Sequence, residues 1–79
     1  MVNALVLFKM DGLVTDEMSE RIRSKSLANA KQLICGTLRD EIIVDLAANT
    51  AKDLHVALGE FAEVPGVKSV TILRITEQS

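Results

Sequence analysis

Residues 41–75 constrain the fold of this chain more than any other stretch. They read EIIVDLAANTAKDLHVALGEFAEVPGVKSVTILRI. An alternating apolar segment is followed by a polar pair, an amphipathic helical segment, a Pro-Gly corner and a second apolar segment. This succession predicts a strand, a helix and a strand, which together form one half of a split βαβ sandwich.

The helix in this stretch has clear start and stop signals. Asn49 and Thr50 stand where a helix N-cap is needed, and Thr50 with Asp53 forms a loose capping-box variant. Apolar residues then recur at three- and four-residue spacing, which is typical of a buried helical stripe. Pro65-Gly66 is expected to end the helix, because proline cannot continue the hydrogen-bond ladder and glycine can adopt the turn conformation.

The first half of the chain predicts a similar succession. The apolar run Val2–Met10 predicts a strand, and Thr15 is expected to cap a helix whose first turn is acidic. We expect this helix to stop between Lys25 and Ala30. The short apolar segment Leu33–Leu38 contains a glycine and predicts a second strand with a bulge or bend.

The elements therefore follow the order βαββαβ, with the last two strands expected at Ile42–Ala47 and Val67–Thr76. This order predicts an α+β fold, a ferredoxin-like sandwich with two helices on one face of a four-stranded antiparallel sheet. With 79 residues and a hydrophobic fraction of 48%, the chain can build one core. We expect a single domain over residues 1–79.

The sheet face away from the helices is predicted to be apolar. The first strand carries apolar side chains in both directions, and so does the last. Whichever set packs on the helices, a second set is left over, for instance Leu5, Leu7, Leu73 and Ile75. Monomers rarely expose so contiguous a patch, so we predict a homodimer or higher oligomer that packs sheet against sheet or extends a sheet edge. The alternative is a small monomer with scattered exposed apolar residues.

Composition excludes several partner classes. The net charge is −2 and the basic residues form no stripe, so we expect no nucleic-acid partner. No apolar run approaches the length of a membrane span, and the N-terminus has no secretory signal pattern, so we expect no membrane partner. A single cysteine fits a reducing compartment, and the cytoplasm is the expected location.

Chemistry-bearing residues are sparse. His55 is expected on the exposed side of its helix, and Cys35 in its apolar strand is expected to behave as a small hydrophobe. The acidic residues Asp40, Glu41 and Asp45 could hold a hard cation, but they are better explained as residues that cap a turn and protect a sheet edge. We therefore expect no catalytic residues, no metal and no cofactor, and a protein that is not an enzyme.

The chain resembles the stand-alone form of the effector-binding, ACT-like domain of Lrp/AsnC-type regulators. The resemblance lies in three segments, VNALVLFKM, LRDEIIVDL and DLHVALGEFAEVPGVKSVTIL. The resemblance covers nearly the whole chain and implies dimers that associate further and bind small, amino-acid-like effectors between subunits. The hairpin glycine and aspartate of that family are represented by Gly36 and Asp40, which the resemblance connects with hairpin and interface geometry. SLANAKQLI stands where the family has a second Gly-Val corner.

Other interpretations stay open. LVLFKMDGLVTDE resembles the start of stress-responsive dimeric α/β-barrel proteins, which would imply a small enzyme with a cavity between sheet and helices. The last half is also similar to archaeal elongation factor 1-beta and to small nitrate-reductase maturation chaperones. The leading hypothesis is a non-enzymatic effector-binding or oligomerisation module. The alternatives are a protein-interaction factor that uses its sheet face, such as an exchange factor or chaperone, and a small dimeric-barrel enzyme. The candidate ligand or interface residues are Gly36, Asp40, Leu5, Leu7, Leu73 and Ile75.

Overall fold

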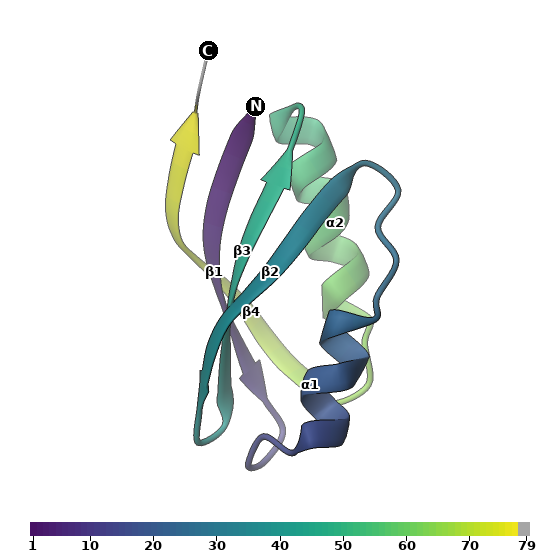
Figure 1. Cartoon of the computed structure of the whole chain (residues 1–79), viewed down its shortest axis with the longest axis vertical. Helices are drawn as coiled ribbons and strands as arrows, with labels where there is room; N and C mark the ends of the chain where they lie inside the picture. Colours follow the sequence, from purple (N-terminus) through teal and green to yellow (C-terminus); the bar gives the residue numbers. More distant parts are fainter. Residues whose placement is uncertain (78–79) are drawn as a thin grey trace.

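The computed structural model describes residues 1–77, apart from the side chains of Ile34 and Cys35. The predicted order βαββαβ is confirmed (Figure 1). The elements are β1 (Val2–Met10), α1 (Asp16–Arg23), β2 (Ala30–Leu38), β3 (Glu41–Ala48), α2 (Ala51–Ala62) and β4 (Val67–Glu77).

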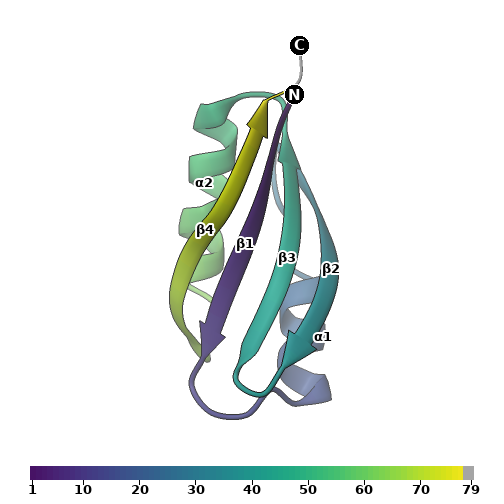
Figure 2. The same cartoon turned by 90° about the vertical axis from the view of Figure 1, so that its left-hand side faces the viewer.

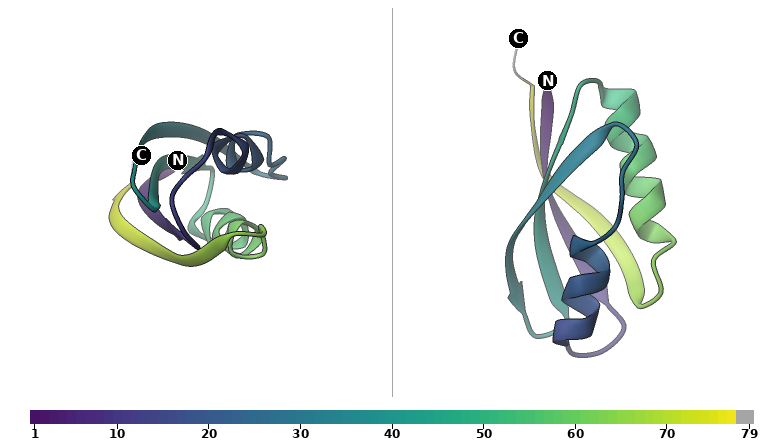
Figure 3. Two further views of the ribbon diagram at one scale, coloured as in Figure 1. Left: turned by 90° about the horizontal axis from the view of Figure 1, so that it is seen from below. Right: turned by 45° about the vertical axis from the view of Figure 1, so that its right-hand side comes forward.

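The strands form one four-stranded antiparallel sheet in the order β2-β3-β1-β4. Both helices lie on the same side of this sheet, as the view from below shows (Figure 3). Seen from the side of the sheet, the strands lie in front and both helices lie behind them (Figure 2). The chain therefore has an α+β fold of two layers, and this arrangement is consistent with a ferredoxin-like sandwich.

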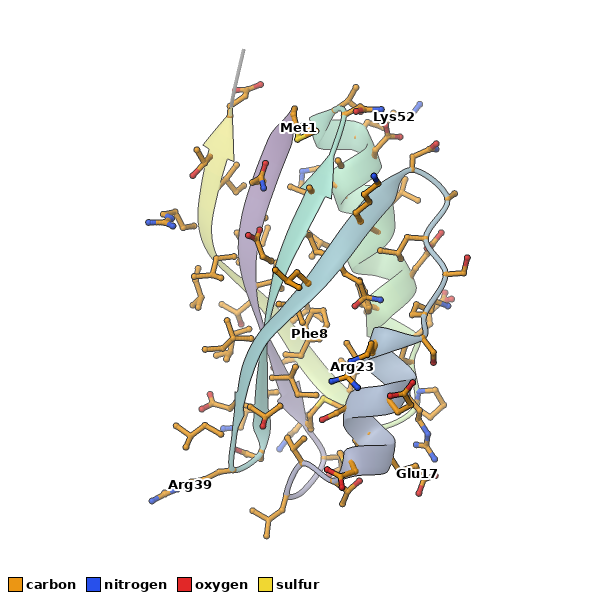
Figure 4. The ribbon with its side chains drawn as sticks, in the orientation of Figure 1. Met1, Phe8, Glu17, Arg23, Arg39 and Lys52 are labelled. Atoms are coloured by element: carbon orange, nitrogen blue, oxygen red, sulfur yellow. The ribbon has the colours of Figure 1, made fainter. Side chains whose placement is uncertain are left out.

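The core fills the space between the two layers. Alternate residues of β1 and β3 point to the helices and are buried, and α2 contributes the stripe Leu54, Ala57 and Phe61. Phe8 and Phe61 meet at its centre, with ring centroids 4.9 Å apart. Figure 4 shows Phe8 in the middle of the molecule. Among the described residues no polar or charged residue is buried, so apolar packing fills the space between the layers.

Both helices begin where the sequence predicts. The backbone N–H of Met18 donates to Thr15 Oγ1 at 3.2 Å, and that of Asp53 donates to Thr50 Oγ1 at 3.1 Å. Each bond satisfies one of the amide donors that a helix N-terminus leaves without a partner. Gly66 has a φ of 97° at the corner after α2, a conformation that glycine adopts at no steric cost.

Helix α1 is shorter than expected. It ends at Arg23, before the predicted range, because the side chain of Gln32 binds its last turn. Gln32 Nε2 donates to the carbonyls of Ile22, Arg23 and Lys25 at 2.7, 3.2 and 3.1 Å. These bonds reach carbonyls at the C-terminus of the helix, where the regular hydrogen-bond pattern ends, and the carbonyl of Ile22 also accepts from the backbone N–H of Lys25 at 3.3 Å.

Strand β2 is longer than expected. It begins at Ala30, whereas the sequence predicted a start at Leu33, because Ala30 pairs with Ala48 at the end of β3. Leu27 packs against the core from the connection between α1 and β2. The predicted bend in this strand is confirmed as a register shift between Ile34 and Gly36.

Candidate functional site: the open face of the sheet

The face of the sheet away from the helices is covered by no other described element (Figure 2). We call it the open face. The pairing registers define its members in rows across the strands. In the order β2, β3, β1, β4 the rows are Lys31-Ala47-Asn3-Thr76, Leu33-Asp45-Leu5-Arg74, Gly36-Ile43-Leu7-Thr71 and Leu38-Glu41-Lys9-Ser69.

The centre of the open face is apolar. Leu5 and Leu7 of β1 and Ile43 of β3 lie next to one another and are half-buried by their neighbours. On the outer strand β2, Leu33 and Leu38 are 67% and 66% exposed. An apolar centre on an uncovered sheet face is the pattern that marks an interaction surface, because a solvated face would carry polar residues.

The sequence predicted Leu5, Leu7, Leu73 and Ile75 as one left-over set, and the structure separates them. Leu5 and Leu7 lie on the open face, but Ile75 pairs with the buried Ala4 and therefore shares the helix-side direction. The reason is a register shift in β4 opposite Leu5 and Val6. One extra residue in a strand reverses the direction of every side chain beyond it.

Leu73 and Ile75 are nevertheless accessible. Leu73 stands at the register shift and is 50% exposed, and Ile75 is 52% exposed. The bulge also brings Arg74 into the row of Leu5. Sequence reasoning missed Arg74 as a residue of the site, because strict alternation places it on the other face.

The residues that the family resemblance singles out lie apart from this centre. Gly36 pairs with Ile43 on the open face; it has no positive φ, and a Cβ there would meet nothing within 4 Å. Its backbone therefore does not require glycine. Asp40 stands in the two-residue turn between β2 and β3, where it forms an ion pair with Lys9 at 3.5 Å. Arg39, the other turn residue, has a φ of 55° and lies at the tip of the hairpin (Figure 4).

Two opposite charges flank the apolar centre. Asp45 of β3 and Arg74 of β4 lie on either side of Leu5 in the same row, and both line a hollow of about 260 Å³ together with Asn3 and Thr76. Neither charge makes an ion pair with any residue in the range 1–77. Asn3 Oδ1 is buried and has no hydrogen-bond partner among the described atoms. Buried polar atoms in folded proteins almost always have a partner.

A larger hollow of about 510 Å³ lies beside the first row of the open face. It is bounded by the connection between α1 and β2 and by the end of β3. The residues that line it are mostly small and apolar, together with Met1, Lys31, Asn29 and Asn49. This volume falls in the range of small-molecule sites. A cation with nearby amides suits a small ligand that carries a carboxylate.

The described residues that were considered for chemistry lie apart from one another. His55 lies on the exposed side of α2, as predicted, whereas Met10 is buried between the layers. The prediction for Cys35 concerns a side chain outside the described ones. Within residues 1–77, no group of His, Cys, Asp and Glu side chains is placed to hold a metal ion.

No protein-family model matches the chain, and no curated protein or solved structure matches it either. None of the helices in the described part of the chain is long and apolar enough to cross a membrane.

Proposed function

We propose that this chain is a non-enzymatic, ferredoxin-like module that associates with further copies of itself through the open face and binds a small, amino-acid-like effector at the edge of that interface. The observation that supports self-association is the apolar centre formed by Leu5, Leu7 and Ile43, which no described element covers. Covering it with a second sheet would produce a sandwich with an apolar layer between two sheets.

The size of the open face sets the expected affinity. Four strands spaced about 4.8 Å apart and about 26 Å long give a flat area of roughly 500 Å² per copy. Stable interfaces of standard size bury about 800 Å² per partner. Because the open face is smaller than that and its central leucines are already half-buried, we expect a dissociation constant in the micromolar range.

The proposed effector site is the hollow of about 510 Å³ beside Lys31. Lys31 and Ala47 belong both to this hollow and to the first row of the open face, so a bound ligand would lie next to the interface. The ammonium of Lys31 would pair with a carboxylate, and the amides of Asn29 and Asn49 would bind the remaining polar groups. This placement agrees with the resemblance to effector-binding domains, in which effectors bind between subunits.

Light scattering coupled to size exclusion tests both parts of the proposal. At low to middle micromolar concentration, the expected result is a mass above that of the 8.6 kDa chain. A mixture of amino acids should shift this mass in the wild type and should shift it less in Lys31→Ala. A monomer at every concentration, with or without the mixture, would contradict the proposal.

A protein-interaction factor is the second candidate, and one observation favours it. Strand β2 lies at an edge of the sheet and carries the exposed Leu33 and Leu38. An extended peptide of another protein could add a strand there, with main-chain hydrogen bonds for affinity and the leucines for specificity. A clean monomer in the scattering experiment would favour this candidate.

The dimeric-barrel enzyme has the least support. Its cavity would have to be lined by Met10, Met18, His55 or Cys35. Met10 is 2% exposed in the core and His55 is exposed on the outer side of α2, so these two do not share a surface.

A further inference from the structure

The row through Leu5 carries one acidic and one basic residue, which could pair with the same row of a second copy. Asp45 and Arg74 occupy the strands on either side of β1, and each is paired with Leu5. With a strand spacing of about 4.8 Å, their backbones are roughly 9.6 Å apart. Neither finds an ion-pair partner among residues 1–77. A charge on an otherwise apolar interaction surface needs a partner once water is removed.

The symmetry of a face-to-face dimer decides which charges meet. If the two-fold axis runs perpendicular to the strands, each strand faces the same strand of the partner subunit. Asp45 would then face either Asp45 of the partner subunit or a neighbouring β3 residue such as Ile43. The first arrangement opposes like charges and the second leaves a carboxylate unpaired on an apolar side chain. Both are unfavourable.

A two-fold axis along the strands exchanges the strands and keeps the rows aligned. If the axis runs along β1, the column of β3 in one copy faces the column of β4 in the other. Asp45 then faces Arg74 of the partner subunit, and the reverse contact forms at the same time. Leu5 and Leu7 lie on the axis and meet their own copies. Both charged residues of the row, Asp45 and Arg74, therefore gain an oppositely charged partner.

We propose that two copies pair through their open faces about a two-fold axis along β1, with reciprocal ion pairs between Asp45 and Arg74. This inference rests on the proposed self-association and specifies its geometry. Asn3 lies on the same axis and would approach Asn3 of the partner subunit. A side-chain amide both donates and accepts, so the two amides can form hydrogen bonds with each other.

In the last row of the open face, Glu41 would face Ser69 of the partner subunit, whose hydroxyl can donate to its carboxylate. Lys9 would approach its own copy at one end of β1, but its charge is compensated within the chain by Asp40 at 3.5 Å. Strand β2, with Leu33 and Leu38, would extend beyond the edge strand β4 of the partner. These exposed leucines would then remain available for contacts in an assembly larger than a dimer.

Charge reversal tests the pairing directly. Asp45→Arg alone places two cations at each contact, and Arg74→Asp alone places two anions there, so each variant should form homodimers at least about 30-fold more weakly than wild type. An equimolar mixture of the two variants brings opposite charges to both contacts. The mixture should therefore form heterodimers with near wild-type affinity, and the double variant Asp45→Arg/Arg74→Asp should form homodimers again.

Matched controls distinguish the proposed pairing geometry from self-association in general. Lys52→Glu and Glu63→Arg change the charge by the same amounts on the helix side and should leave the dimer constant within about threefold. Circular dichroism of each variant reports its fold. Wild-type dimers with no recovery in the mixture would overturn the proposed axis and leave self-association standing. A wild type that stays monomeric at several hundred micromolar would overturn both.

Discussion

Replacing Leu7 by lysine should dissociate the assembly without unfolding the chain. Leu7 lies in the centre of the open face, is half-buried in the single chain, and points away from the core that its neighbours Val6 and Phe8 enter. Full burial of a leucine is worth about 1.5–3 kcal/mol, so covering its remaining surface is worth about 1 kcal/mol. A two-fold interface contains two copies of the residue, so the substitution should cost about 2 kcal/mol of dimerisation free energy. The dissociation constant should then rise about 30-fold.

Sedimentation velocity over a dilution series measures this change, and thermal unfolding at a concentration below the dissociation constant measures the fold. Val56→Lys is the matched control, because Val56 is 51% exposed on α2, on the other side of the molecule. We expect Leu7→Lys to shift the midpoint of dissociation and to leave the unfolding temperature of the monomer within a few degrees of wild type. Equal dissociation constants for wild type, Leu7→Lys and Val56→Lys would refute the reasoning.

Three further predictions concern the stability of the fold and can be checked by urea unfolding. Phe61→Ala removes the ring that packs on Phe8 at 4.9 Å in the core and should cost about 3–5 kcal/mol; a loss below about 1 kcal/mol would mean that the layers are not packed as described. Thr50→Ala removes the N-cap of α2 and should cost about 1 kcal/mol, whereas Thr50→Ser should restore most of it; equal losses in both variants would exclude the cap as the cause. Arg39→Gly relieves a φ of 55° in the turn between β2 and β3 and should stabilise the protein by up to about 1 kcal/mol, and a clear destabilisation would contradict the strain argument.

Most of the architecture could be predicted from the sequence because its signals are local. Strand β1 has its predicted bounds, and Thr15 and Thr50 cap the two helices as expected. In each case the pattern and the structure depend on the same few neighbouring residues. The alternation of buried and half-buried residues along β3 follows from its sequence in the same way.

The deviations depend on contacts between distant segments. The end of α1 is set by Gln32, a residue of β2 that binds carbonyls up to ten positions earlier in the chain. Ser24 and Ser26 weaken the helix near Arg23, but the contact with Gln32 leaves no local signal in the sequence. A helix terminated by a side chain from another element can be found only when the elements have been placed together.

The residues of the open face could be predicted only where the alternation along a strand is unbroken. Leu5 and Leu7 lie on β1, where alternation is unbroken, and they were assigned to the correct face. On β4 a single extra residue reverses the alternation, so Ile75 was assigned to the open face and Arg74 was overlooked. The position of such a bulge depends on pairing with the neighbouring strand, which the sequence of β4 alone does not specify.

The most direct test of the central claim is whether a second copy covers the open face. Methyl-labelled protein can be examined by NMR with a soluble paramagnetic probe, at a concentration well below the expected dissociation constant and at one well above it. We predict that the paramagnetic relaxation enhancement at the methyl groups of Leu5, Leu7 and Ile43 decreases at high concentration. The enhancement at the methyl groups of Val56 should be the same at both concentrations. Relaxation of the open-face methyl groups that is the same at both concentrations would contradict self-association through this face.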